Sequence, residues 1–106
     1  MPAYVAVADP TFWLVKNLQG DRLTLWKLGF RGLPLAGSMS ARFRRLDSPA
    51  MGRLAARLRD RGFAFSAGRD WSPAEVASYL RDEGHFEGPY TEIYWGDGGI
   101  WQLRSH

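Results

Sequence analysis

The sequence contains no cysteine and only two histidines and two lysines among its 106 residues. Without cysteine the chain can form no disulfide, no thiolate metal site and no cysteine nucleophile. The absence of cysteine also fits a reducing compartment. We therefore expect a cytoplasmic protein that is held together by its apolar core.

Long apolar runs are missing as well. The N-terminal residues lack the basic segment that opens a signal peptide, and Asp9-Pro10 interrupts their short apolar run. No apolar stretch approaches the ~20 residues that a membrane-spanning helix needs, so we expect no contact with a membrane. The length corresponds to a single domain, residues 1–106, which can bury about two-thirds of its unfolded surface.

Residues suited to catalysis are scarce. His106 is the final residue, and His85 opens a His-Phe-Glu triplet without the Pro-Cys-x-x-Cys half of a zinc deaminase site. The segment GSMSA (37–41) is not a nucleophile elbow, and GDGG (96–99) lacks the Lys-Ser/Thr of a phosphate-binding loop. We expect the carboxylates of residues 72–83, Glu75, Asp82 and Glu83, to be solvated. Solvated carboxylates are poor acid–base catalysts. We therefore expect a protein that is not an enzyme and uses no cofactor or metal.

Positive charge is carried almost entirely by arginine, with 12 arginines against two lysines. A GC-rich genome favours this usage, but a guanidinium also binds carboxylates and phosphates through paired hydrogen bonds, which lysine cannot do. Residues 42–69 contain eight arginines and two aspartates, whereas residues 70–97 contain seven acidic residues and one arginine. The net charge of +3 therefore belongs to a strongly dipolar chain.

The N-terminal third shows strand patterns. Residues 4–8 and 11–16 are rich in β-branched and aromatic residues, and residues 22–28 alternate between apolar and polar. We expect residues 17–21 to form the hairpin loop between the second and third strands. Residues 29–40 contain three of the twelve glycines and are predicted to be a mobile loop.

Two amphipathic helices are predicted in the middle of the chain. Ser48 and Pro49 suit the start of the first helix and Gly62 its end. A capping box formed by Ser72 and Glu75 opens the second helix. Their apolar stripes are Met51, Leu54, Ala55 and Leu58 in the first helix, and Val76, Ala77 and Leu80 in the second.

Residues 62–67 and 90–95 are predicted strands, and the second continues into a hairpin. A three-residue loop, Asp97-Gly98-Gly99, places Trp95 opposite Trp101 and Tyr94 opposite Gln102. This register is favoured over a two-residue loop because it gathers the apolar side chains on a single face. We expect that face, with Trp95 and Trp101, to belong to the core.

These elements predict an α+β fold. The strand–helix–strand unit over residues 62–95 favours a right-handed crossover between parallel strands. Together with the N-terminal strands it predicts a two-layer sandwich, in which two helices cover one face of a mixed, mostly antiparallel sheet. The predicted element order is β-β-β-α-β-α-β-β.

The arginines fall into two groups. Arg53 and Arg57 recur with Arg61 every four residues on the first helix, where like charges repel each other. The acidic side chains of the second helix could neutralise this row from within the chain. Three further arginines precede the helix and border the glycine-rich loop: Arg42, Arg44 and Arg45. We expect these three above all to face an external anion, with Arg53 and Arg57 as additional contacts.

Two aromatic side chains are candidates for the same surface. Trp26 and Tyr94 lie on the strand faces opposite the predicted core, and they would be exposed if helices cover only one side of the sheet. Exposed tryptophan, tyrosine and arginine are typical of binding hot spots.

The sequence favours a small binding protein that docks on a protein with an acidic surface or on a second copy of itself. Inhibitors, immunity proteins and regulatory adaptors act in this way. The alternative is an accessory nucleic-acid-binding protein whose arginines contact phosphates. The acidic third of the chain and the lack of a nucleic-acid motif argue against that alternative.

Overall fold

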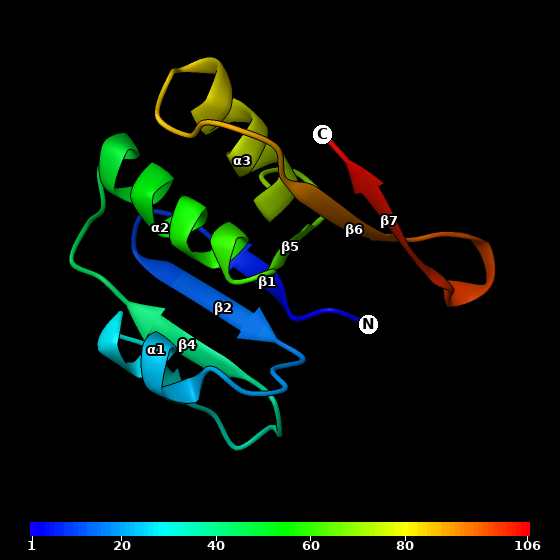
Figure 1. Ribbon diagram of the computed structural model, residues 1–106, viewed down its shortest axis with the longest axis horizontal. Helices are drawn as coiled ribbons and strands as arrows, with labels where there is room; N and C mark the ends of the chain where they lie inside the picture. The colour runs from blue at the N-terminus through cyan, green and yellow to red at the C-terminus, as the bar shows by residue number, and fades with distance from the viewer.

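The computed structural model describes all 106 residues, which form a seven-stranded mixed sheet with three α-helices (Figure 1). The strands are β1 (Tyr4–Ala8), β2 (Phe12–Lys16), β3 (Arg31–Gly32), β4 (Met39–Arg42), β5 (Ala64–Ser66), β6 (Thr91–Trp95) and β7 (Trp101–Ser105). Their order in the sheet is β3-β4-β2-β1-β5-β6-β7. The pairs β1–β5 and β5–β6 are parallel and the other four are antiparallel, so the predicted α+β class with a mixed, mostly antiparallel sheet is confirmed.

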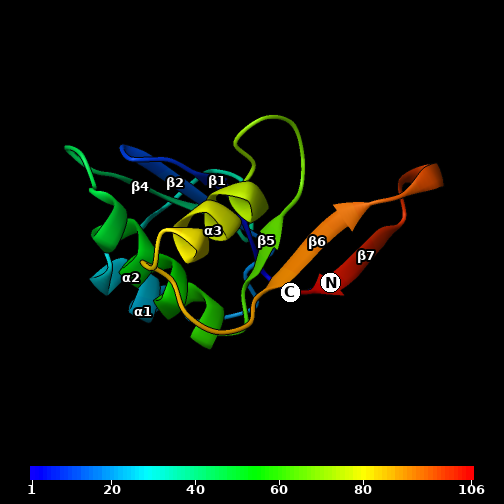
Figure 2. The same ribbon diagram turned by 90° about the horizontal axis from the view of Figure 1, so that it is seen from above.

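The helices lie together on one face of the sheet (Figure 2). They are α1 (Arg22–Lys27), α2 (Ser48–Asp60) and α3 (Pro73–Asp82), and a 3-10 turn, η1 (Asp97–Gly99), joins the last two strands. The core between the layers contains the predicted helix stripes, and the sheet contributes Val5, Trp13, Val15 and Phe65. None of the helices combines the length and the apolar character that a membrane span requires.

The ends of the two long helices follow local sequence signals. The side chain of Ser72 accepts a hydrogen bond from the Glu75 amide at 3.4 Å, which confirms Ser72 as the cap of α3. The reciprocal bond of a capping box does not form, because the Ser72 amide donates to the Arg69 carbonyl. At α2 the cap is Asp47, whose carboxylate accepts from the Ala50 amide at 2.8 Å, one residue before the predicted Ser48. Gly62 follows α2 with φ +90°, as predicted for a glycine stop.

Residues 22–28 are not the predicted strand, because most of them form α1. Alternation over so few residues does not distinguish a strand from a helix. Asn17 and Asp21 both have φ 61°, which turns the chain out of the sheet after β2. Residues 39–42, predicted to be loop or irregular, take the place beside β2 as β4, and β3 lies inside the predicted loop as well.

The final hairpin has the predicted register but the opposite orientation. Trp95 pairs with Trp101 and Tyr94 with Gln102. Phe65 of the core pairs with Glu92, so Glu92 and Tyr94 face the helix layer, and Trp95 faces away from it. Trp95 and Trp101 are therefore 41% and 40% exposed instead of belonging to the core. The reason is the register beside β5, which turns Trp95 and Trp101 to the face that no helix covers, on a hairpin that projects from the body of the molecule (Figure 1).

Candidate functional site

The five arginines predicted to face a partner are all exposed. None of them has a carboxylate within 4.0 Å of its guanidinium, and the ion pairs of the chain are formed by other residues. The five are Arg42, Arg44, Arg45, Arg53 and Arg57. Their positive charge is therefore available to an external anion.

The internal neutralisation of the α2 arginines by α3 does not form. Arg61 instead pairs with Asp21 at the start of α1, and Arg59 pairs with Asp60 at 2.9 Å. The side of α2 that faces the chain after α3 carries Gly52, which lies against the backbone carbonyl of His85. Arg53 and Arg57 lie on other sides of the helix, where no acidic side chain reaches them.

The segment that carries Arg44 and Arg45 runs along the turn between β1 and β2. The Phe43 amide donates to the Thr11 carbonyl at 2.8 Å, and the Leu46 amide donates to the Pro10 carbonyl at 2.7 Å. Arg42, at the end of β4, places its guanidinium 4.9 Å from the centre of the Phe12 ring on the uncovered face of the sheet. Backbone hydrogen bonds thus hold the arginine segment beside the turn.

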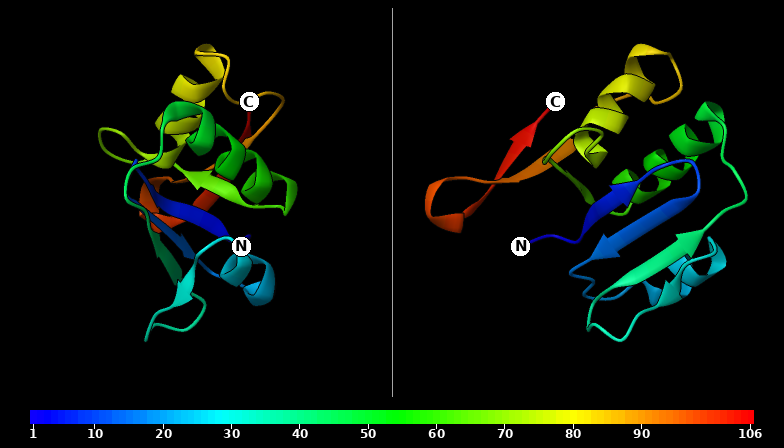
Figure 3. Two further views of the ribbon diagram at one scale, coloured as in Figure 1. Left: turned by 90° about the vertical axis from the view of Figure 1, so that its left-hand side faces the viewer. Right: turned by 180° about the vertical axis from the view of Figure 1, so that it is seen from behind.

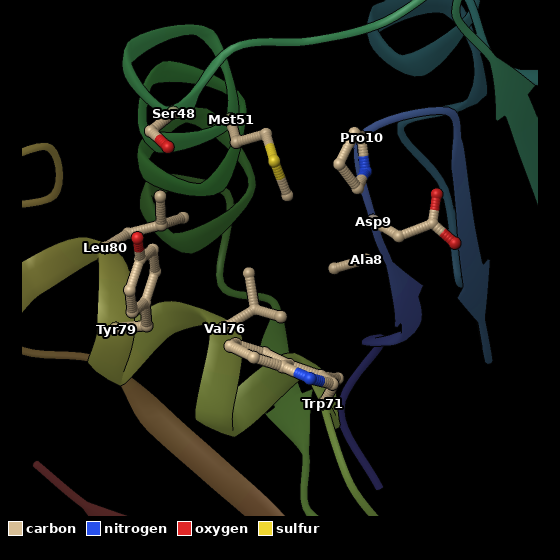
Figure 4. A pocket seen from close by; sticks show the side chains of 9 residues that line it. All are labelled: Ala8, Asp9, Pro10, Ser48, Met51, Trp71, Val76, Tyr79 and Leu80. Carbon is tan, nitrogen blue, oxygen red and sulfur yellow. The ribbon is translucent and has the colours of Figure 1, made fainter.

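Next to this segment lies an apolar pocket of about 420 Å³, which the sequence did not predict. It is bounded by the turn after β1, the start of α2, the residue Trp71 before α3 and one side of α3 (Figure 4). Its wall consists of Ala8, Asp9, Pro10, Ser48, Met51, Trp71, Val76, Tyr79 and Leu80. A pocket of this size and character is suited to an apolar group from outside the chain.

The polar atoms of the pocket are few. The Asp9 carboxylate points away from it in Figure 4 and accepts hydrogen bonds from the amides of Thr11 and Phe12, at 2.9 and 2.7 Å. The hydroxyls of Ser48 and Tyr79 are the remaining side-chain oxygens of the wall. The interior thus offers apolar contact and hardly any hydrogen bonding.

Trp71 forms the exposed wall of the pocket. Its side chain is 66% exposed, and its ring meets that of Tyr79 edge to face at 5.9 Å. Its φ of 61° lies in the left-handed region, which costs a bulky residue about 1–3 kcal/mol. Trp71 precedes the Ser72 cap and Val76 follows it, the two positions of a hydrophobic staple. That spacing is the one signal in the sequence that could have pointed to this wall.

The backbone of the arginine segment adjoins the pocket. Pro10 lines the pocket and also accepts the hydrogen bond from Leu46, directly after Arg45. Ser48 lines the pocket three residues beyond Arg45. An apolar cavity therefore has two unpaired guanidinium groups, those of Arg44 and Arg45, within a few residues of its rim.

The structure does not bring the two predicted aromatic contacts together. Trp26 is exposed on α1, and the guanidinium of Arg31 lies 4.6 Å from its ring centre. Tyr94 is only half-exposed on β6, where its hydroxyl donates to Gln102 at 2.9 Å and Arg104 lies over its ring. These elements lie towards opposite ends of the sheet (Figure 3). Neither aromatic residue lines the pocket.

The charge of the chain is separated in space as well as in sequence. Residues 10–60, which form β2, α1, β3, β4 and α2, contain ten Lys and Arg against three Asp. Residues 61–106, which form the other end of the sheet and α3, contain seven acidic residues against four Arg. The arginine segment belongs to the basic half, so it would attract an acidic surface.

No protein-family model matches the sequence, and neither does any curated protein or solved structure. The pocket, its arginines and the charge of its surroundings are consequently the observations that bear on function.

Proposed function

We propose that this chain is a small non-enzymatic binding protein that docks on a protein partner with an acidic surface, as inhibitors, immunity proteins and regulatory adaptors do. The observation that carries this proposal is the apolar pocket beside the segment of Arg44 and Arg45, neither of which has a carboxylate within 4.0 Å of its guanidinium. An apolar side chain of the partner enters the pocket, while its Asp and Glu residues contact the guanidinium groups. We place this interaction in the cytoplasm, which the absence of cysteine supports.

The two parts of the site contribute differently. Full burial of one leucine or phenylalanine side chain is worth about 1.5–3 kcal/mol, so the pocket supplies most of the affinity. An exposed ion pair is worth about 0–1 kcal/mol, and it acts mainly on orientation and on the rate of association. Arg42, Arg53 and Arg57 extend the positive surface around this centre.

Nucleic-acid binding is the alternative that the same arginines support, because unpaired guanidinium groups also bind phosphates. The acidic half of the molecule would repel a polyanion, and a narrow apolar pocket has no role in contacts with a phosphate backbone. The protein partner is therefore the function that accounts for both the pocket and the charge.

Selection from a random peptide library displayed on phage tests this proposal, with the intact protein immobilised. We expect enriched peptides to carry a leucine or an aromatic residue flanked by Asp and Glu. Their affinity should fall about tenfold or more in Trp71→Ala, through loss of the pocket wall, and severalfold in Arg44→Ala/Arg45→Ala. The control Arg22→Ala/Lys27→Ala removes two exposed charges on α1 and should retain most of the affinity.

A library that yields no enrichment, or peptides unaffected by either site variant, would contradict the proposal. A single-stranded oligonucleotide of mixed sequence serves as the competing probe. If it binds, and if the magnitude of the log–log salt slope falls by about 1.4 in Arg44→Ala/Arg45→Ala, the arginines bind phosphates and the alternative holds.

A further inference from the structure

We propose that two copies of this chain form a dimer by pairing their β7 strands antiparallel across a two-fold axis at Leu103. This surface lies at the acidic end of the sheet and is separate from the pocket. The proposal therefore does not depend on the function given above.

β7 is an open edge of the sheet. It pairs with β6 alone, and all of its residues, Trp101–Ser105, are exposed. The β6–β7 hairpin projects from the body of the molecule, and no helix or loop covers its outer edge (Figures 1 and 2). A projecting edge with apolar side chains is a template for pairing with another strand, unless it is protected by charge, proline or a bulge.

The hydrogen bonds of the hairpin show which backbone groups are free. The amides and carbonyls of Tyr90 and His106 bond to each other, and the Gly96 amide donates to the Ile100 carbonyl. In an antiparallel ladder the direction of these groups alternates. Gln102 and Arg104 therefore bond to β6, and the N–H and C=O groups of Trp101, Leu103 and Ser105 point outward.

A two-fold axis at Leu103 satisfies all of these outward groups. Leu103 then pairs with Leu103 of the second copy, and Trp101 pairs with its Ser105. An axis one residue away in either direction leaves one of the three positions without a strand partner. A shift of half a residue pairs outward groups with inward ones and forms no ladder.

Side chains favour the same register. On the uncovered face, Leu103 meets its counterpart, and Trp101 lies close enough to reach it diagonally. On the other face, Gln102 stands opposite Arg104 of the second copy. An axis at Arg104 would instead place two arginines directly opposite each other, which is unfavourable.

The apolar patch of the uncovered face becomes continuous in this dimer. Tyr4 packs edge to face on Trp95 at 5.5 Å, and Trp95 lies opposite Trp101 in the hairpin. Leu103, which is 47% exposed in the single chain, is the last apolar side chain before the edge. The pairing joins the two patches across the axis, which explains why this hairpin carries apolar residues where solvent would favour polar ones.

Light scattering coupled to size exclusion measures the mass, and we expect twice the 12.0 kDa of one chain at about 0.1 mM. Leu103→Lys puts two like charges opposite each other and should raise the dimer dissociation constant more than tenfold. Ser105→Pro removes one outward N–H and leaves the β6 ladder intact, so it should also weaken the dimer. Leu35→Lys alters a leucine that is 67% exposed near the other end of the sheet and should remain dimeric. Circular dichroism checks that each variant is folded.

Single cysteines report the register, since the natural chain contains none. In the proposed dimer the Cα atoms of the two Leu103 residues lie about 5.5 Å apart, within the range that a disulfide spans. Mild oxidation should link Leu103→Cys, whereas Gln102→Cys and Arg104→Cys should stay unlinked. A monomeric wild type, a dimer insensitive to Leu103→Lys and Ser105→Pro, or preferential linking at residue 102 or 104 would overturn the proposal.

Discussion

Trp71 combines two properties that rarely occur together in one residue. Three non-glycine residues of the chain have positive φ, and the other two are Asn17 and Asp21. Asparagine and aspartate tolerate the left-handed region, but a large aromatic residue does not. The backbone at Trp71 is therefore strained, and its indole remains mostly exposed on the wall of the pocket. Strain held at an exposed aromatic side chain is typical of a binding residue.

Two substitutions at Trp71 distinguish the energetic cost of the backbone strain from the cost of losing the indole. Trp71→Gly and Trp71→Ala both remove the indole, but only glycine adopts φ near 60° without a steric cost. We expect Trp71→Gly to have a free energy of unfolding about 1 kcal/mol higher than Trp71→Ala, measured by urea denaturation. Equal stability, or a more stable alanine variant, would show that the left-handed backbone carries no strain.

At the scale of the elements, Gly52 decides how α2 packs. A glycine inside a helix normally costs about 1 kcal/mol relative to alanine. A Cβ atom at Gly52, however, would lie 1.8 Å from the carbonyl oxygen of His85 and 2.7 Å from its carbon. Only glycine lets the helix approach the segment that leads from α3 to β6.

Gly52→Ala should therefore destabilise the protein, although the substitution favours an isolated helix. We expect a loss of about 2–3 kcal/mol in the free energy of unfolding, because the contact is with backbone and only a shift of the helix can relieve it. Gly20→Ala is the matched control, since no atom lies within 4 Å of its added Cβ. That variant should change stability by less than about 0.5 kcal/mol. A Gly52→Ala variant as stable as the wild type would refute the close approach.

On the scale of the whole molecule, the order of the strands separates a covered centre from open ends. β1 and β5 lie in the middle of the sheet beneath α2 and α3 and have a bonded strand on both sides. β7 lies at the edge and is bonded on one side only. The same order separates the basic half from the acidic half. The proposed acidic partner and the proposed strand pairing therefore belong to opposite ends of the sheet.

Amide hydrogen exchange can test this difference between the centre and the edge of the sheet. The measurement needs the single chain, so it uses Leu103→Lys at low concentration, where we expect no dimer. In β1 we expect slow exchange at Tyr4 and Val5, the positions paired with both β2 and β5. In β7 the amides of Gln102 and Arg104 should exchange about tenfold or more slowly than those at positions 101, 103 and 105, which point into solvent. Uniformly fast exchange from residue 101 to 105 would mean that the hairpin does not form as described.

Several features followed from short stretches of sequence because the interactions that decide them are local. The Ser72–Glu75 cap, the stop at Gly62 and the apolar stripes of α2 and α3 involve residues at most a few positions apart. The register of the last hairpin also follows from its own loop and pattern. The α+β class could be inferred from these elements alone.

Other features depended on residues far apart in the chain. Residues 22–28 do not form a strand, because β4 occupies the position beside β2 that they would need. Which face of the hairpin turns towards the helices was decided by its register beside β5. The pocket joins the Asp9–Pro10 turn, the start of α2 and the Trp71 wall, and no sequence period links them.

The sequence by itself determined the secondary structure around its caps and glycines, the arginine excess and the charge asymmetry, since each is a property of neighbouring residues or of composition. Only the tertiary structure decided which arginines stay unpaired, which aromatic side chains face solvent and where an apolar cavity remains. These outcomes depend on which distant segments pack against one another. When one face of a helix or strand is buried by such packing, its other face remains for a partner or for water.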